Sequence, residues 1–177
     1  MTKITQRLSL LVAASCFLAA CATPPAKISH EKPVDEINNQ RGLALRGYDP
    51  VAYFTDKKPT AGKPDITYQW KGATYQFATV KHRQLFQGDP EHYAPQFGGY
   101  CAYAVSLGTT ADGDPFQWAV AGDKLFVNNN AIAYTLWNKS RSKNIRQGVV
   151  NWPLIPKQPV ASDSAMATSP EDKATAR

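Results

Sequence analysis

The chain has 177 residues, and its 20 Lys and Arg residues outnumber its 14 Asp and Glu residues, which gives a formal charge of +6. All eight Tyr, all four Trp and six of the seven Phe lie within residues 48–152. This concentration predicts one folded unit of about 115 residues, which we place at residues 41–156, and a unit of that size buries roughly two thirds of its surface. No second aromatic-rich segment remains to form another domain.

The first twenty residues have the pattern of a secretory signal. Lys3 and Arg7 form a positively charged start, and residues 8–20 (LSLLVAASCFLAA) form an apolar stretch. A membrane-spanning helix needs roughly 20 apolar residues, so this stretch is too short to span a bilayer. No other segment of the sequence is as apolar, and no transmembrane helix is predicted for the mature protein.

Residues 18–21 (LAAC) resemble the bacterial lipobox, in which the cysteine receives a diacylglycerol and becomes the new N-terminus. An ordinary cleaved signal with Cys21 as a bystander is the alternative, but four matching positions at the correct distance from the charged start favour lipidation of Cys21. Several acyl chains anchor a protein stably in a membrane. The residue after the cysteine is Ala22 and not aspartate, which by the sorting rule of well-studied lipoproteins favours the outer membrane. We therefore expect a lipoprotein of the bacterial cell envelope, anchored in the outer membrane and facing the periplasm, where nucleic acid is not an expected partner.

Processing before Cys21 changes the cysteine and charge counts. Cys16 leaves with the signal and Cys21 is acylated, so Cys101 remains as a single thiol and no intrachain disulfide can form. Loss of two cations lowers the formal charge from +6 to +4. Residues 21–40 are polar and contain prolines, which predicts a flexible tether, and residues 157–177 lack any aromatic residue, which predicts a disordered tail.

The first half of the folded unit contains a predicted β-hairpin. Residues 66–70 and 73–77 alternate aromatic and polar side chains on either side of Lys71-Gly72. That pattern is typical of two strands joined by a tight turn. Residues 51–54 (VAYF) predict a further strand.

Two short helices are predicted to follow the hairpin. Thr79 can cap a helix that runs through Phe86 and ends at Gly88. Asp89 can cap a second helix, because Pro90 then occupies its first position and the acidic residue that follows is favoured by the helix dipole.

The second half predicts another hairpin and a longer helix. Residues 117–120 and 124–127 are the strands of the hairpin, and Asn129 or Asn130 opens the helix. One stripe of that helix, at helical spacing, is formed by Ala133, Leu136, Trp137 and Ser140. We therefore expect a compact α+β domain with two β-hairpins, several short helices and one longer C-terminal helix. The cations near its end are Lys139, Arg141, Lys143 and Arg146, for which a solvated helix end is the simpler interpretation and an anionic lipid the alternative.

Two segments carry a resemblance to a known family. Residues 47–54 (GYDPVAYF) resemble the opening signature of YHS-domain proteins, and residues 96–105 (QFGGYCAYAV) resemble the centre of the longer, exported branch of that family. The resemblance covers residues 42–153. It continues through Leu85-Phe86, Asp89–Tyr93, Asp114-Pro115, Trp118, Gly122–Asn128 and Asn151–Pro153.

The resemblance implies metal binding, since short YHS domains sit beside copper-transporting pumps and metal-dependent oxygenases and are thought to bind metal through cysteines. The family pattern has a cysteine where this chain has Ala52 and another where it has Ala78. A third family cysteine corresponds by spacing to His82. Two of the three soft-ligand positions are therefore alanines here.

The remaining metal-site candidates are Cys101, His82 and His92. A thiolate with imidazoles suits copper(I) or zinc. No CxxC or HxxxH pair forces these residues together. A lone cysteine in an aromatic stretch is more often a packed core residue, and both histidines are predicted on solvent-facing helix surfaces.

Three functions remain open at this point. The first is a non-enzymatic metal-handling module, for copper or zinc, that uses Cys101 with His82 or another ligand. The second is a metal-free module that binds a protein or a small ligand. The third is a cysteine-dependent enzyme, which only the single thiol supports and which we place last, so no enzymatic activity is expected.

Overall fold

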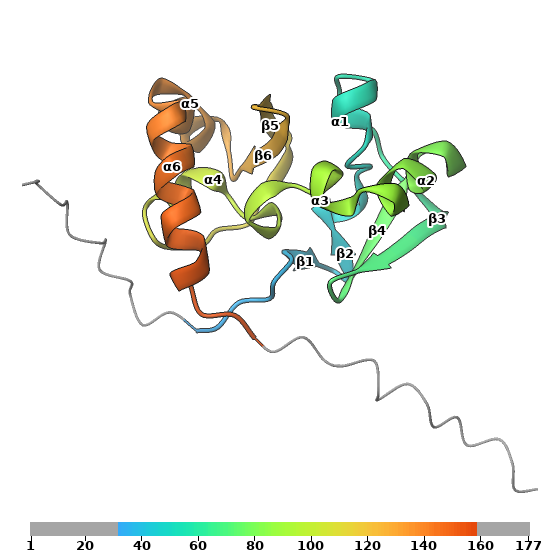
Figure 1. Cartoon of the computed structure of the whole chain (residues 1–177), viewed down its shortest axis with the longest axis horizontal. Coiled ribbons are helices and arrows are strands. Elements are labelled where there is room, and N and C mark those ends of the chain that lie inside the picture. Colours follow the sequence, from blue (N-terminus) through green and yellow to red (C-terminus); the bar gives the residue numbers. More distant parts are fainter. Residues whose placement is uncertain (1–31, 159–177) are drawn as a thin grey trace, which may run out of the picture.

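Two separate β-sheets and six α-helices make up the fold in the computed structural model, which describes residues 32–158 (Figure 1). The larger sheet has the strand order β1-β2-β4-β3, and β2 runs parallel to β4 while the other neighbours are antiparallel. Its strands are β1 (Asn39–Gln40), β2 (Leu43–Ala44), β3 (Lys63–Trp70) and β4 (Ala73–Phe77). The second sheet is the antiparallel pair β5 (Asp114–Ala121) and β6 (Lys124–Asn128). The predicted α+β class and both hairpins are confirmed.

The turn of the first hairpin follows from its sequence. Trp70 pairs with Ala73, and the two residues between them, Lys71 and Gly72, have φ angles of 48° and 74°. Positive φ at both central positions defines the type I′ turn, whose twist matches that of the flanking strands. This turn carries Trp70 and Lys71 to the edge of the sheet, where both line a cleft described below.

The helices are short, and three of the six have a side-chain cap. They are α1 (Ala52–Thr55), α2 (Val80–Gly88), α3 (Pro90–Tyr93), α4 (Ala102–Ser106), α5 (Ala131–Lys139) and α6 (Arg141–Asn151). Three 3₁₀ turns accompany them: η1 (Leu45–Gly47), η2 (Gln96–Gly99) and η3 (Trp152–Leu154). The predicted caps are confirmed, because Thr79, Asp89 and Asn130 each accept a hydrogen bond from a backbone N–H of the helix that follows.

Residues 51–54 form most of α1 and not the strand that we predicted. The reason lies just before them, where Asp49 Oδ1 accepts hydrogen bonds from the backbone N–H groups of Val51 and Ala52. A carboxylate that satisfies the first N–H groups of a turn favours helix over strand, and Pro50 supplies a fixed φ angle at that point. The Asp-Pro pair therefore acts here as it does at Asp89-Pro90.

The predicted long C-terminal helix is broken into α5 and α6 at Ser140, whose φ and ψ angles of −134° and 44° are not helical. Asn144 Nδ2 donates to the carbonyl oxygen of Trp137 and so satisfies the end of α5. The stripe prediction is only partly right. Trp137 is fully buried, whereas Leu136 is 44% exposed and Ser140 is also exposed.

The packed part of the chain begins before residue 41. Ile37 and Asn38 are buried, and Asn38 donates its backbone N–H to the carbonyl oxygen of Gly98. A Cβ on Gly98 would lie 2.1 Å from the carbonyl oxygen of Glu36, so this crossing requires glycine. The predicted signal, Cys21 and most of the predicted tether and tail lie outside the described residues.

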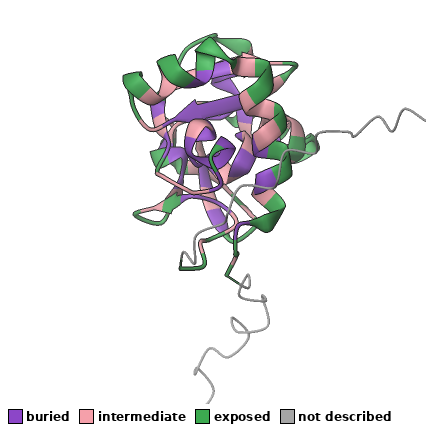
Figure 2. Ribbon diagram, turned by 90° about the vertical axis from the view of Figure 1, so that its left-hand side faces the viewer, coloured by how far each residue is buried: buried purple, intermediate pink, exposed green. Residues whose placement is uncertain are grey.

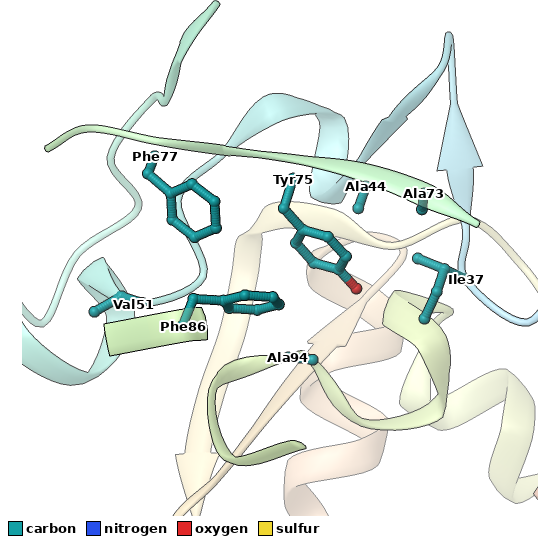
Figure 3. Packing of buried hydrophobic residues seen from close by; sticks show 8 residues of the cluster. All are labelled: Ile37, Ala44, Val51, Ala73, Tyr75, Phe77, Phe86 and Ala94. Carbon is teal, nitrogen blue, oxygen red and sulfur yellow. The ribbon is translucent and has the colours of Figure 1, made fainter. Parts of the chain in front are cut away.

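The buried side chains form two main clusters, which define two lobes, and Figure 2 shows the buried positions gathered inside a shell of exposed helix turns. The hairpin lobe is built on Ile37, Ala44, Val51, Ala73, Tyr75, Phe77, Phe86 and Ala94 (Figure 3). The C-terminal lobe is built on Phe97, Tyr100, Ala102, Val105, Ala119, Phe126, Trp137 and Ile155. A third cluster holds residues of both halves of the chain, including Tyr53 and Leu125. None of the helices in residues 32–158 is long and apolar enough to cross a membrane.

Two buried tyrosines differ in how their hydroxyl groups are satisfied. Tyr53 Oη donates to the carbonyl oxygen of Pro115 at 3.0 Å. Tyr75 Oη has no hydrogen-bond partner among the described residues, and it points toward Ile37 (Figure 3). Burial raises the pKa of both phenols, so both stay protonated.

We expect Tyr75→Phe to raise the free energy of unfolding by up to about 1 kcal/mol, because it removes a buried donor that has no acceptor. Tyr53→Phe should lower it by about 1 kcal/mol, since the carbonyl oxygen of Pro115 then loses its donor. Urea unfolding of the two variants and the parent chain measures both values. A loss of stability in Tyr75→Phe equal to that in Tyr53→Phe would contradict the assignment.

Candidate functional site

Asp49 is fully buried and accepts hydrogen bonds from three parts of the hairpin lobe. Its Oδ1 accepts the backbone N–H groups of Val51 at 2.9 Å and Ala52 at 3.4 Å, which begin α1. Its Oδ2 accepts the backbone N–H of Ala78 at 2.8 Å, just after β4, and lies 2.7 Å from Nδ1 of His82 on α2. A buried carboxylate is tolerated only when donors surround it in this way.

His82 is buried, so the prediction that it faces solvent is wrong. The Thr79 cap fixes the first turn of α2, and from there the imidazole reaches inward to Asp49. Its second ring nitrogen, Nε2, lies 3.4 Å from Thr55 Oγ1 and 4.0 Å from Asp56 Oδ1. With Nδ1 bound to a carboxylate, the ring orientation is fixed and Nε2 is presented to these two oxygens.

The three positions that the sequence resemblance matches to cysteines of YHS domains converge in space. Ala52, Ala78 and His82 all contact Asp49, two through their backbone N–H groups and one through its ring. The alanines offer no metal ligand, and both carboxylate oxygens are already occupied by hydrogen bonds. The residues present at these positions therefore do not form the soft, thiolate-rich site that the resemblance implies.

Cys101 lies elsewhere, at the start of α4 in the C-terminal lobe. It is 1% exposed, and its Sγ is 3.8 Å from Oδ1 of the fully buried Asn128. The same oxygen accepts the backbone N–H of Tyr103 at 3.1 Å. These contacts give the thiol a packing role. They also leave it without the solvent access that a cysteine nucleophile requires.

His92 is the third predicted ligand, and it lies in yet another environment. Its ring packs against Phe54 and Tyr93, with centroid distances of 4.9 and 4.5 Å. Its Nδ1 is 3.5 Å from Asp123 Oδ2. Within residues 32–158 no group of three or more His, Cys, Asp or Glu side chains is placed to hold a metal ion. The structure thus does not bring Cys101, His82 and His92 together.

A cleft of about 310 Å³ opens where the two lobes meet. Trp70 and Lys71 reach it from the turn between β3 and β4, whereas Val149 and Trp152 reach it from the end of α6 and from η3. Phe97 forms part of its wall between them. Its volume lies within the range of small-molecule sites, which are typically apolar clefts with a few polar groups.

Charged groups stand among the residues that line the cleft. Lys71 Nζ lies 2.9 Å from Glu91 Oε1 and 4.5 Å from the centroid of the Trp70 ring. Glu36 adds a second carboxylate. The cleft therefore combines indole rings with two carboxylates and one ammonium group, so a ligand with a positive charge is favoured over an anion.

The unpartnered hydroxyl of Tyr75 lies beneath this cleft. It points toward Ile37 (Figure 3), and Ile37 and Ala94 are both cleft-lining residues. Tyr75 itself is fully buried and does not line the cleft, so these two neighbours separate its hydroxyl from the cleft. Sequence reasoning assigned Tyr75 only to a strand, because its orphaned hydroxyl becomes visible only once its neighbours are known.

Comparison of the chain with protein-family models, with curated proteins and with solved structures found no match in any of the three.

We expect Asp49→Asn to lower the free energy of unfolding by about 2–4 kcal/mol. The reason is that the side-chain NH₂ of asparagine would face backbone N–H groups, such as those of Val51 and Ala78, which are themselves donors. Asp65→Asn, on the exposed side of β3, is the matched control and should change stability by less than about 0.5 kcal/mol. Denaturant unfolding followed by circular dichroism gives both values. Equal, small effects would show that Asp49 does not organise the hairpin lobe.

Proposed function

We propose that this protein is a lipid-anchored, non-enzymatic binding module of the bacterial envelope. Its cleft between the lobes binds a small molecule that carries an aromatic ring and a positive charge. The observation that carries the proposal is the cleft of about 310 Å³ with Trp70 and Trp152 contributed by different lobes. The anchor at Cys21, the outer-membrane address and the kinship with exported YHS-domain proteins belong to the same proposal and rest on sequence motifs.

Aromatic side chains make the cleft suited to a planar ligand. Indole rings provide large apolar faces on which another ring can stack, and they also attract cations. The cation already present, Lys71, lies over Trp70 and is paired with Glu91. A cationic ligand can take the place of Lys71 beside the carboxylate, which explains how affinity and charge selectivity arise together.

Three indole compounds test the charge preference because they share one ring and differ in charge. Tryptamine is a cation, tryptophan is a zwitterion and indole-3-acetate is an anion. We expect isothermal titration of the full mature chain to show binding in the order tryptamine, tryptophan, indole-3-acetate. Trp152→Ala should weaken tryptamine binding at least tenfold, since it removes one aromatic wall.

The control is Phe116→Ala, which removes an aromatic side chain that is 59% exposed and does not line the cleft. It should leave tryptamine binding unchanged. Glu91→Gln should reduce the preference for tryptamine over indole-3-acetate, because it removes one of the two carboxylates. Equal loss of tryptamine binding in Phe116→Ala and Trp152→Ala would show that the cleft is not the binding site.

Metal handling is a second candidate function, and the orientation of His82 favours it. Metal-ligating histidines usually donate their other ring N–H to a carboxylate, and the 2.7 Å contact between His82 Nδ1 and Asp49 is of that kind. His82 Nε2 and Asp56 Oδ1 are ligand types that suit zinc better than copper(I). Asp49 would hold the ring, and these two atoms would hold the ion.

Zinc titration of the chain, followed by calorimetry, tests this second candidate. If His82 is a ligand, binding should be lost in His82→Asn and in Asp56→Asn and retained in Cys101→Ser. Loss of binding in Cys101→Ser alone would instead point to a thiolate site. Absence of zinc binding by the parent chain would leave the cleft as the functional site.

A further inference from the structure

The N-terminal segment leaves the folded part beside the C-terminal end of α6. Val34 forms backbone hydrogen bonds with Pro156 and Gln158, which follow η3 and α6. Figure 1 shows the two ends of the described chain together below the foot of α6. Val34 is only 13 positions after Cys21, so a lipid on Cys21 would lie within about 45 Å of this point even with the segment fully extended.

One face of α6 is exposed and carries both apolar and basic side chains. Lys143, Arg146 and Val150 follow each other at helical spacing, and all three are exposed. Val149 and Val150, at the end near the N-terminal segment, are 59% and 56% exposed. Leu154 in η3 extends the apolar part and is also exposed. We name these five residues the α6 face.

The stretch of chain that carries the α6 face is basic. No Asp or Glu occurs from residue 124 to residue 158. The cations in that stretch are Lys124, Lys139, Arg141, Lys143, Arg146 and Lys157. Carboxylates from other segments lie at its border: Glu36 acts on Lys157, and Glu36 and Glu91 line the cleft together with Val149. The combination of apolar side chains with the basic residues of α6 suits an anionic, partly apolar surface.

We propose that the α6 face docks onto the anionic phospholipid surface in which the chain is anchored. This inference rests on the proposed acylation of Cys21, because the short N-terminal segment starts at the foot of the same face. Val149, Val150 and Leu154 enter the headgroup region, and Lys143 and Arg146 contact lipid phosphates. Each basic side chain near such a surface strengthens binding about fivefold.

The tether to the bilayer favours a membrane over an acidic protein as the partner of this face. A membrane-anchored chain is always within reach of the bilayer, which gives the lipid surface a high effective concentration. A soluble acidic protein has no such advantage. Docking would also place the mouth of the cleft near the membrane, because Val149 lines the cleft and belongs to the α6 face.

The test uses the full acylated chain in phosphatidylethanolamine vesicles that contain either no phosphatidylglycerol or 30% of it. One dye is attached at Ser142→Cys on α6, and in a second protein at Gln87→Cys on α2, both of which are exposed positions. Lipids with a nitroxide headgroup quench a dye that lies at the bilayer surface. The buried Cys101 is protected from labelling in the folded protein.

We expect strong quenching at position 142 and weak quenching at position 87, only in the vesicles that contain phosphatidylglycerol. Lys143→Gln and Arg146→Gln should each lower the ratio of docked to undocked protein about fivefold, and 0.5 M salt should have a similar effect. Lys57→Gln and Lys58→Gln, which remove cations from the hairpin lobe, are the matched controls and should leave quenching unchanged.

Equal quenching at both positions in anchored protein would overturn the docking proposal and leave an acidic protein as the partner of the α6 face. Quenching at position 142 that does not change with the phosphatidylglycerol content or with the two substitutions would also overturn it. Mass spectrometry of the N-terminal peptide tests the anchor separately. A Cys21 without acyl chains overturns the anchor and this inference, whereas ligand binding in the cleft is measured independently of both.

Discussion

The hairpin lobe depends on one buried negative charge. Asp49 accepts hydrogen bonds from the start of α1, from the end of β4 and from the imidazole of α2, so a single side chain fixes three elements relative to one another. Removing a carboxylate from water is costly unless donors replace the lost solvent. Here two of those donors come from the backbone of Ala52 and Ala78. Polar contacts to Asp49 thus hold these segments together.

Local signals in the sequence were sufficient for much of the fold. The first hairpin follows from alternating side chains around a two-residue turn, and the caps at Thr79, Asp89 and Asn130 were predictable because a cap acts within three residues. The segment at residues 51–54 was misread because its composition favours a strand, whereas the preceding Asp49 imposes a helix. The burial of Ile37 depends on contacts with a distant segment, since the neighbouring Asn38 bonds to Gly98. The break at Ser140 involves a hydrogen bond between Asn144 and Trp137, which the helical spacing of the apolar residues does not reveal.

The candidate site was less predictable than the fold. Cys101, His82 and His92 are the right residue types for a metal, yet each is committed to a different partner: Asn128, Asp49 or Asp123. The cleft joins Trp70 and Trp152, which are more than 80 positions apart, so only the packing of the two lobes makes it. A site formed between lobes leaves no motif in the sequence, because neither wall has a function by itself.

Tyr75 shows how the cleft and the core of the hairpin lobe are coupled. Its ring packs against Phe86 in the core, while its hydroxyl is left without a partner beneath the cleft. For stability alone a phenylalanine would serve better at this position, since an unsatisfied buried donor lowers stability. Functional sites are where a protein keeps such locally unfavourable groups. The orphaned hydroxyl, the two indole rings and the nearby α6 face therefore support one arrangement. In it, both proposed binding surfaces lie at one end of the molecule, where the lobes and the N-terminal segment meet.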